Sequence, residues 1–167
     1  SKKIFDHIKK MRYHGKNQIT SKFDFLGINS QMPTITAEIL LEKIKHNDEW
    51  ILKRKKIAEY YSKNLKGNIV VPEVGKNHVF HKYVILTPKR NELKAYLKKN
   101  KIDTMIHYSN LLSENKYLKK YMKNKKDFKI ANKISKNVLS LPVHPFLKDK
   151  EIKKIVKTVN NFFKNQK

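Results

Sequence analysis

VFHKYVIL, residues 79–86, is the strongest strand signal in the chain. Its β-branched and aromatic residues favour extended backbone, and Pro88 stops the run shortly afterwards. Shorter runs of the same kind stand at Ile69–Pro72, Ile102–His107 and Val138–Pro142. We expect these segments to form a small, mainly antiparallel sheet.

Helical spacing of apolar residues surrounds the strand candidates. It predicts helices over residues 1–12, 34–65, 91–99, 114–124, 128–137 and 148–164. The long second stretch is expected to break at His46-Asn47, so that Asp48 begins a new helical run. Helices of this kind can cover one face of a small sheet, which indicates an α+β sandwich.

Three helices carry patterns that predict their buried faces. Leu93 and Leu97 share one face of the helix expected at residues 91–99. The final helix has an apolar stripe made of Ile152, Ile155, Val156, Val159 and Phe163. The first helix has a stripe of Ile4, Phe5, Ile8 and Met11. Since one short amphipathic helix cannot bury its stripe alone, we expect a preceding element against it.

The charge balance is strongly basic, with a net charge of +25 over 167 residues. A basic chain suggests nucleic acid or an anionic membrane as a partner. However, 36 of the 39 basic residues are lysines spread along the whole chain, and isoleucine (17) and asparagine (16) are also abundant. Because A/T-rich codons encode these three residues, we favour a base bias of the genome over a nucleic-acid footprint.

Several other classes of site are excluded by residue type. The chain has no cysteine, so disulfides and thiolate metal sites are excluded. Its seven histidines form no H-x-x-x-H pair on a helix, and we therefore expect no metal site. No apolar run is long enough to span a membrane. The N-terminus resembles no signal peptide, so a cytoplasmic protein is the expectation.

Ordered motifs along nearly the whole chain resemble the DegT/DnrJ/StrS family of nucleotide-sugar aminotransferases. The residues that carry this resemblance are Arg12–Gly15 (RYHG), Gly27–Met32 (GINSQM), Thr36–Leu41 (TAEILL), Trp50–Tyr61 (WILKRKKIAEYY), His81–Tyr83 (HKY), Lys101–Tyr108 (KIDTMIHY) and Leu139–Pro145 (LSLPVHP). None of these motifs is specific alone, but all of them in one order are hard to obtain by chance.

The resemblance implies a fold-type I enzyme that uses pyridoxal 5'-phosphate (PLP) and works as a homodimer. It further implies a division of this chain into three parts. Residues 1–33 would belong to the large PLP-binding domain and its cofactor-proximal loop. Residues 34–66 would be a long connecting helix, and residues 67–167 the small C-terminal domain.

The family holds PLP as a Schiff base to a lysine in a Ser-x-x-Lys-like segment upstream of the motif at Arg12–Gly15. None of the 36 lysines of this chain stands in that context. The resemblance therefore implies that the catalytic lysine is missing, no residue of this chain is assigned a catalytic role, and the chain alone is expected to be inactive. A partner copy or a missing N-terminal half would complete the enzyme, and a split gene, a truncated remnant and an expressed fragment all remain open.

The resemblance places cofactor contacts in the loop at residues 15–33. Asn29 matches the family's asparagine that reaches across the dimer to the partner's PLP phosphate, with Gly27 and Gln31 beside it. A hydrogen bond from an amide N–H to a phosphate oxygen is charge-assisted. The structural alternative is that Asn29 takes a left-handed turn conformation after Gly27. Gln31 stands where the family usually has arginine or lysine, which weakens anion binding there.

The resemblance places substrate contacts at His107, Tyr108 and His14. His107 and Tyr108 match the family's His-Tyr pair near the substrate entrance, although Ser109–Ser113 departs from the usual continuation. The alternative is that His107 ends a strand and Tyr108 packs. His14, next to Gly15, is also a candidate for shaping its loop. We expect His81 and Tyr83 to be packing residues.

The intact enzyme would transfer an amino group, typically from glutamate, to a nucleotide-linked keto-sugar in amino-sugar biosynthesis. Two alternatives stay open. A PLP-dependent sugar dehydratase of the same family would keep this fold. A basic nucleic-acid-binding module would use the lysine-rich run Lys116–Lys129 with Tyr117, Tyr121 and Phe128, although aromatic residues on a helix more often pack its inner face.

Overall fold

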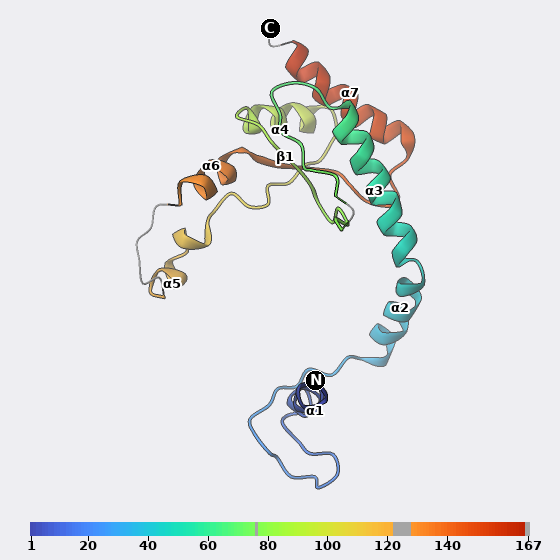
Figure 1. Ribbon diagram of the computed structural model, residues 1–167, viewed down its shortest axis with the longest axis vertical. Helices are drawn as coiled ribbons and strands as arrows, with labels where there is room; N and C mark the ends of the chain where they lie inside the picture. The colour runs from blue at the N-terminus through green and yellow to red at the C-terminus, as the bar shows by residue number, and fades with distance from the viewer. Residues whose placement is uncertain (76, 122–127, 166–167) are drawn as a thin grey trace. The chain divides into compact units, whose positions relative to one another are not determined.

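The computed structural model describes residues 1–75, 77–121 and 128–165. The chain divides into two compact units, Ser1–Asn47 and Asp48–Lys167. The first contains α1 (Lys2–Met11) and α2 (Thr34–Lys45), and α3 begins at the boundary between the units (Figure 1). The remaining elements follow in the order α3 (Asn47–Asn64), β1 (Tyr83–Leu86), α4 (Arg90–Lys99), η1 (Leu112–Glu114), α5 (Lys116–Lys119), α6 (Lys129–Asn137), β2 (Val138–Leu141) and α7 (Asp149–Lys164).

The sheet of the second unit consists of β1 and β2, which pair antiparallel from Tyr83↔Leu141 to Leu86↔Val138. Val70 forms a single bridge to Leu86, and Met105 forms a single bridge to Ser140. The segments expected as strands at 69–72 and 102–107 therefore lie along the two outer edges of the sheet. Each makes one bridge rather than a ladder, so the prediction of full strands there is wrong.

The strand expected over residues 79–86 begins only at Tyr83. Phe80 adopts a left-handed backbone conformation with φ of 46°, and its N–H donates to Nδ1 of His78 at 2.9 Å. Its ring is nevertheless fully buried. A non-glycine residue in this region breaks extended geometry, so ladder pairing starts after it.

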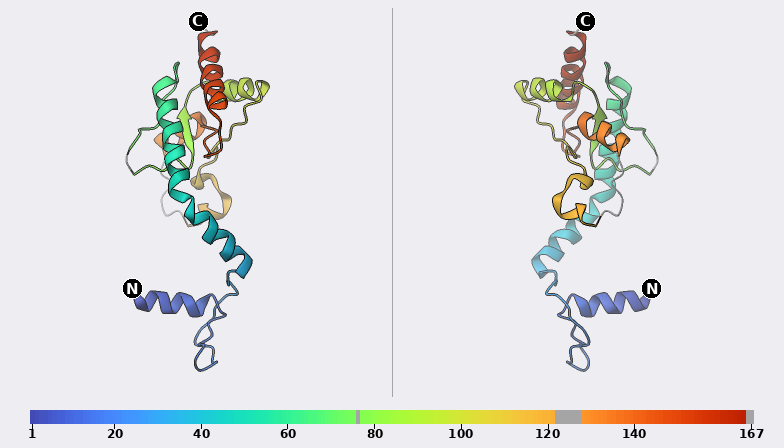
Figure 2. Two further views of the ribbon diagram at one scale, coloured as in Figure 1. Left: turned by 90° about the vertical axis from the view of Figure 1, so that its right-hand side faces the viewer. Right: turned by 90° about the vertical axis from the view of Figure 1, so that its left-hand side faces the viewer.

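The hydrophobic core lies against one face of the sheet. Tyr83 and Ile85 of β1 and Leu139 and Leu141 of β2 belong to one buried cluster with residues of α3, α4 and α7. Residues of a strand alternate between its faces, and these four share a face by register. Helices α4 and α7 pack against each other (Figures 1 and 2). The predicted α+β architecture, with helices on one face of a small antiparallel sheet, is confirmed.

The predicted helix faces of the second unit are largely correct. Leu93 and Leu97 are fully buried, and four members of the predicted stripe of α7 are buried. The fifth position differs, because Phe162 is buried and Phe163 is only partly so. At the start of α7 the Glu151 carboxylate accepts a hydrogen bond from the Lys148 N–H at 2.8 Å, which satisfies a free backbone donor of the first turn.

The buried tyrosines tie α3 to the sheet. The rings of Tyr61 and Tyr83 meet edge to face with centroids 5.1 Å apart. The Tyr61 hydroxyl donates to the carbonyl of Pro142 at 3.0 Å, and the Tyr83 hydroxyl lies 2.8 Å from Oγ of Ser62. Burial raises the pKa of both phenols, and the hydrogen bond with Ser62 lowers that of Tyr83 in part. Both rings thus pack in the core with their polar ends satisfied.

The helix expected over residues 114–124 is much shorter, spanning Lys116–Lys119 as α5, and residues 122–124 lie outside the described ranges. The Asn115 side chain accepts from the Tyr117 N–H at 2.9 Å and caps this turn. Tyr117 and Tyr121 are exposed and Phe128 is 41% exposed, so the expectation that these aromatic rings pack is wrong.

The first unit, unlike the second, has almost no buried residues. The predicted stripe of α1, made of Ile4, Phe5, Ile8 and Met11, is exposed, and Gly15 is the one buried residue among those described in this unit. Helices α2 and α3 are separate at His46, as expected from the sequence. In the described part of the chain, no helix combines the length and apolarity needed to cross a membrane.

Candidate functional site

Ser140 anchors a polar site on the face of the sheet opposite the core. Its neighbours Leu139 and Leu141 point into the core, so alternation places the Ser140 side chain on the other face. There its Oγ lies 2.9 Å from Nδ1 of His107. The backbones of Ser140 and Met105 exchange two hydrogen bonds, of 2.7 and 3.3 Å, which hold the segment carrying His107 against β2.

Tyr108 extends the site toward solvent. Its side chain is 69% exposed, so the alternative that Tyr108 packs is wrong. Lys82 approaches it in two ways, since Nζ donates to the Tyr108 hydroxyl at 3.4 Å and lies 5.3 Å from the centre of its ring. The rings of His107 and Tyr108 meet edge to face, with centroids 5.4 Å apart. A cation, a phenol and an imidazole therefore converge at one partly open position.

The electrostatics of this site favour a neutral imidazole. Burial lowers the pKa of His107, and electrostatic interaction with Lys82 and His81 lowers it further. His81 is exposed beside Lys82, so the expectation that His81 packs is wrong, whereas Tyr83 is buried as expected. A neutral His107 can both donate and accept a hydrogen bond, while Lys82 keeps the site attractive to anions.

Lys82 and Ser140 are the site residues that sequence reasoning missed. Lys82 stands in the HKY motif between His81 and Tyr83, for which the sequence predicts only packing. Ser140 stands in the LSLP motif, where a single serine between two core leucines signals a polar side chain on the opposite face of a strand. That alternation could have identified Ser140, but no sequence signal pairs it with His107, which is 33 residues away.

The predicted cofactor loop of the first unit is held by two close-packed glycines. A β-carbon at Gly27 would stand 2.1 Å from the backbone N of Gly15 and 2.4 Å from C of His14. Gly15 itself has φ of +75°, and a β-carbon there would meet the carbonyl of Phe25. Only glycine fits at either position, and this contact brings the two ends of the loop together.

Backbone pairing then fixes the residues after Gly27. The His14 N–H donates to the Ile28 carbonyl at 3.0 Å, and the Ser30 N–H donates to the Arg12 carbonyl at 2.9 Å. Asn29 forms an antiparallel bridge with Tyr13 and is not among the residues with positive φ. The alternative of a left-handed turn at Asn29 is therefore wrong. Two other non-glycine residues here are left-handed, His14 at the start of the loop and Ser21 within it, each with φ of 58°.

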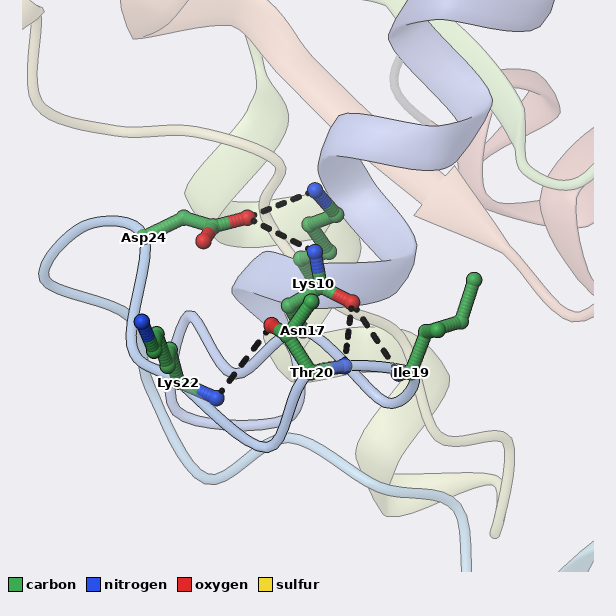
Figure 3. Close-up of polar contacts among 6 residues, drawn as sticks. All are labelled: Lys10, Asn17, Ile19, Thr20, Lys22 and Asp24. Atoms are coloured by element: carbon green, nitrogen blue, oxygen red, sulfur yellow. Dashed lines mark hydrogen bonds and ion pairs between the residues drawn. The ribbon is translucent and has the colours of Figure 1, made fainter.

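A polar network closes the tip of this loop (Figure 3). Nζ of Lys10 donates to the Asp24 carboxylate at 2.6 Å, and the Asn17 amide donates to the same oxygen at 3.4 Å. Asn17 Oδ1 accepts from the N–H groups of Ile19 and Thr20 at 3.0 and 3.3 Å. The hydrogen bond from Lys10 lowers the pKa of the Asp24 carboxyl, with burial opposing it. These contacts order the loop without using Asn29 or Gln31.

Asn29 and Gln31 present free polar groups. Both residues are exposed, and neither side chain makes a hydrogen bond to any residue in the described ranges. The fixed backbone and a free amide donor at Asn29 fit a phosphate oxygen. Gln31 offers an amide but no charge.

The six predicted residues fall into two groups. Asn29, Gly27, Gln31 and His14 belong to the first unit, and His107 and Tyr108 belong to the second. In the first group, the backbone around His14 pairs with the backbone of residues 28–30. In the second group, the two residues are consecutive. Over the described residues, no three histidine or carboxylate side chains gather in a way that could hold a metal ion.

Comparison with known proteins gives the same family as the motifs. The sequence model of the DegT/DnrJ/EryC1/StrS aminotransferase family matches residues 1–160. The chain is 36% identical to a pleiotropic regulatory protein of Geobacillus stearothermophilus over 84% of its length. It is 30% identical to the dTDP-3-amino-3,6-dideoxy-alpha-D-galactopyranose transaminase of Aneurinibacillus thermoaerophilus over 83% of its length. It spans only 39% and 38% of those two proteins.

Solved structures agree with this assignment. A DegT DnrJ EryC1 StrS aminotransferase from Brucella abortus superposes with a TM-score of 0.91 and 28% identity, covering 98% of this chain and 44% of that one. The structure of ntda from Bacillus subtilis, solved with bound cofactor PMP, gives a TM-score of 0.84 and 26% identity, covering 93% of this chain and 38% of that one. The chain thus matches less than half of the length of each of these two structures.

Proposed function

Because the chain belongs to the DegT/DnrJ/EryC1/StrS aminotransferase family, we propose that it forms the C-terminal part of a PLP-dependent aminotransferase acting on a nucleotide-linked keto-sugar. The observation that carries the proposal is the family match over residues 1–160. The name of the transaminase from Aneurinibacillus thermoaerophilus supports an amino sugar linked to a nucleotide as the product class. Glutamate is the proposed amino donor.

The proposed division of labour follows the three segments expected from the sequence. Residues 1–33 contribute the cofactor-proximal loop. Residues 34–66 form the connecting helix, and residues 67–167 form the small domain. In this proposal the lysine that carries the cofactor lies outside these three segments. The isolated chain would therefore bind PLP weakly and transfer no amino group.

Asn29 is the proposed phosphate contact. PLP, when bound, supplies an electron sink for the reaction. The loop pairing through Gly27 holds the Asn29 backbone, so only the side-chain rotamer has to be ordered for its amide to donate to a phosphate oxygen. In the homodimer proposed for the family, this donor would serve the partner's cofactor. Gln31 would add a neutral hydrogen bond beside it.

His107, Tyr108 and Lys82 form the proposed substrate side. The Lys82 ammonium beside Tyr108 suits the anionic phosphates that link a sugar to its nucleotide. The Tyr108 hydroxyl and the neutral His107 ring can exchange hydrogen bonds with sugar hydroxyls. Ser140 orients the ring through Nδ1. His14 is the remaining proposed substrate contact, and it would also shape the loop that carries Asn29.

The experiment uses the longest natural protein that contains residues 1–167. Amino transfer from ¹⁵N-labelled glutamate to UDP- and dTDP-linked keto-sugars is followed by mass spectrometry. Label in the sugar is expected with the whole protein and not with residues 1–167 alone. A PLP-loaded protein that labels no nucleotide-linked keto-sugar would contradict the proposal.

Two variants test the assigned roles in the same protein. Lys82→Gln is expected to raise KM for the nucleotide sugar about tenfold, because it removes one charge-assisted contact, with kcat little changed. Asn29→Asp is expected to weaken PLP binding, since it sets a carboxylate against the phosphate. Lys98→Gln, on the exposed surface of α4, is the matched control and should alter neither quantity.

A further inference from the structure

A cavity of about 620 Å³ opens in the second unit between α3, the loop after β2 and the start of α7. Pockets of this volume with mainly apolar walls are typical of small-molecule sites. The cavity lies among the helices on the core face of the sheet, whereas His107 and Ser140 lie on the opposite face. The proposed function assigns it no role.

Aromatic and aliphatic side chains form the walls of this cavity. Tyr60 of α3 lies on one side, and Phe146 and Leu147 of the loop lie on the other. Phe146 is 68% exposed, and its ring meets that of Trp50 edge to face at 5.9 Å. A large apolar ring left in water at the wall of a cavity is a surface that gains by contact with an apolar ligand.

The charged groups at the cavity are mainly lysines. Lys53 and Lys56, three residues apart on α3, share a face of the helix, and Lys153 of α7 stands opposite with Asp149. Lys53 is engaged by Glu49 at 2.6 Å. Within the described ranges, Lys56 and Lys153 have no ion-pair partner. Three lysines against one lining carboxylate leave an excess of positive charge beside an apolar wall.

We propose that this cavity binds a small amphipathic anion, an aromatic or alicyclic body carrying one carboxylate, sulfonate or phosphate. The apolar body contacts Tyr60 and Phe146, and the acidic group lies between Lys56 and Lys153. Neither half of the site selects such a ligand alone. Lysines by themselves attract any anion, and the aromatic wall by itself attracts any apolar surface.

The test uses the full 167-residue chain and 1-anilinonaphthalene-8-sulfonate as the probe, with fluorescence as the readout. Saturable binding at one site is expected. The neutral analogue N-phenyl-1-naphthylamine, which lacks the sulfonate, should bind at least about tenfold more weakly. Equal affinity for the two probes would overturn the role of the lysines.

Matched variants separate the cavity from the general basicity of the chain. Lys56→Gln with Lys153→Gln, and separately Phe146→Ala, should each weaken binding of the sulfonate probe about tenfold. The control pair Lys63→Gln with Lys157→Gln removes two exposed charges from the same helices outside the cavity lining and should leave affinity unchanged. An equal loss in the control pair would overturn the proposal.

Backbone amide shifts locate the probe independently of affinity. Shifts concentrated at residues 53–60 and 145–153 on titration with the sulfonate probe are the expected result. Shifts concentrated instead at the exposed stripe of α1 would overturn the proposal, because they would assign the binding to a different apolar surface. Far-ultraviolet circular dichroism checks that each variant retains its helices.

Discussion

A single β-carbon at position 27 would collide with backbone atoms of Gly15 and His14. Backbone cannot yield as a flexible side chain does, so Gly27→Ala should separate the paired segments of the loop. We expect a cost of about 1–3 kcal/mol, in the range of overpacked sites. The measurement is loss of hydrogen-exchange protection at the His14 and Ser30 amides.

Gly75→Ala is the matched control for that substitution. A β-carbon at Gly75 would meet nothing within 4 Å, and this variant should leave protection at His14 and Ser30 unchanged. Retained protection in Gly27→Ala would show that the glycine contact does not hold the loop.

The second prediction at the scale of a residue concerns the pKa of His107 and its effect on stability. Its pKa in the folded chain lies below the ordinary value of 6.5, with burial as the largest cause. The unfolded chain therefore binds the proton more tightly. The stability contributed by neutral His107 is present above pH 6.5 and is lost as pH falls through the folded pKa.

Nuclear magnetic resonance titration of the His107 ring checks this value directly. In Lys82→Gln the pKa should rise but stay below 6.5, because the charge is removed and the burial remains. Lys98→Gln should cause no change. A pKa at or above 6.5 in the unsubstituted chain would contradict the described environment.

Helix α4 shows how one element depends on its buried face. Leu93 and Leu97 are fully buried although most of the helix is polar. Leu97→Ala should lower the free energy of unfolding by about 2–5 kcal/mol, since it removes buried methyl groups and leaves a cavity. Urea denaturation measures the change. Leu112→Ala, at a 78% exposed position, should stay within about 0.5 kcal/mol of the unsubstituted chain.

At the scale of the whole molecule, the two units differ in buried apolar surface. The core cluster lies entirely in the second unit, while apolar residues of α1 and α2 are exposed. Amides of α1 should therefore exchange by local opening, and those of α7 only by global unfolding. Hydrogen exchange of the unsubstituted chain and of Leu97→Ala tests this expectation. The substitution should accelerate amide exchange in α7 and leave amide exchange in α1 unchanged. Equal acceleration in both helices would contradict the prediction.

The sequence by itself determined the family, the loop motif and most of the helices, although the helix expected over residues 114–124 spans only Lys116–Lys119 in its described part. The helical spacing of apolar residues in α1, α4 and α7 is a local property of consecutive residues, so the sequence alone predicts these helices. Residues 15–33 have neither a helical nor a strand period and include Gly15, Gly27 and Asn29, which likewise predicts a loop. The break between α2 and α3 was visible because asparagine and aspartate favour helix starts.

Tertiary structure alone decided the extent of the strands and the partners in the site. Val70 and Met105 each make a single bridge because strand length depends on the facing chain rather than on local composition. The pairing of His107 with Ser140, and of Tyr108 with Lys82, joins residues distant in sequence. Such contacts depend on register and on which face of β2 the core occupies. A single sequence does not encode them as a local pattern, because the physical quantity that selects them is the packing of the whole core.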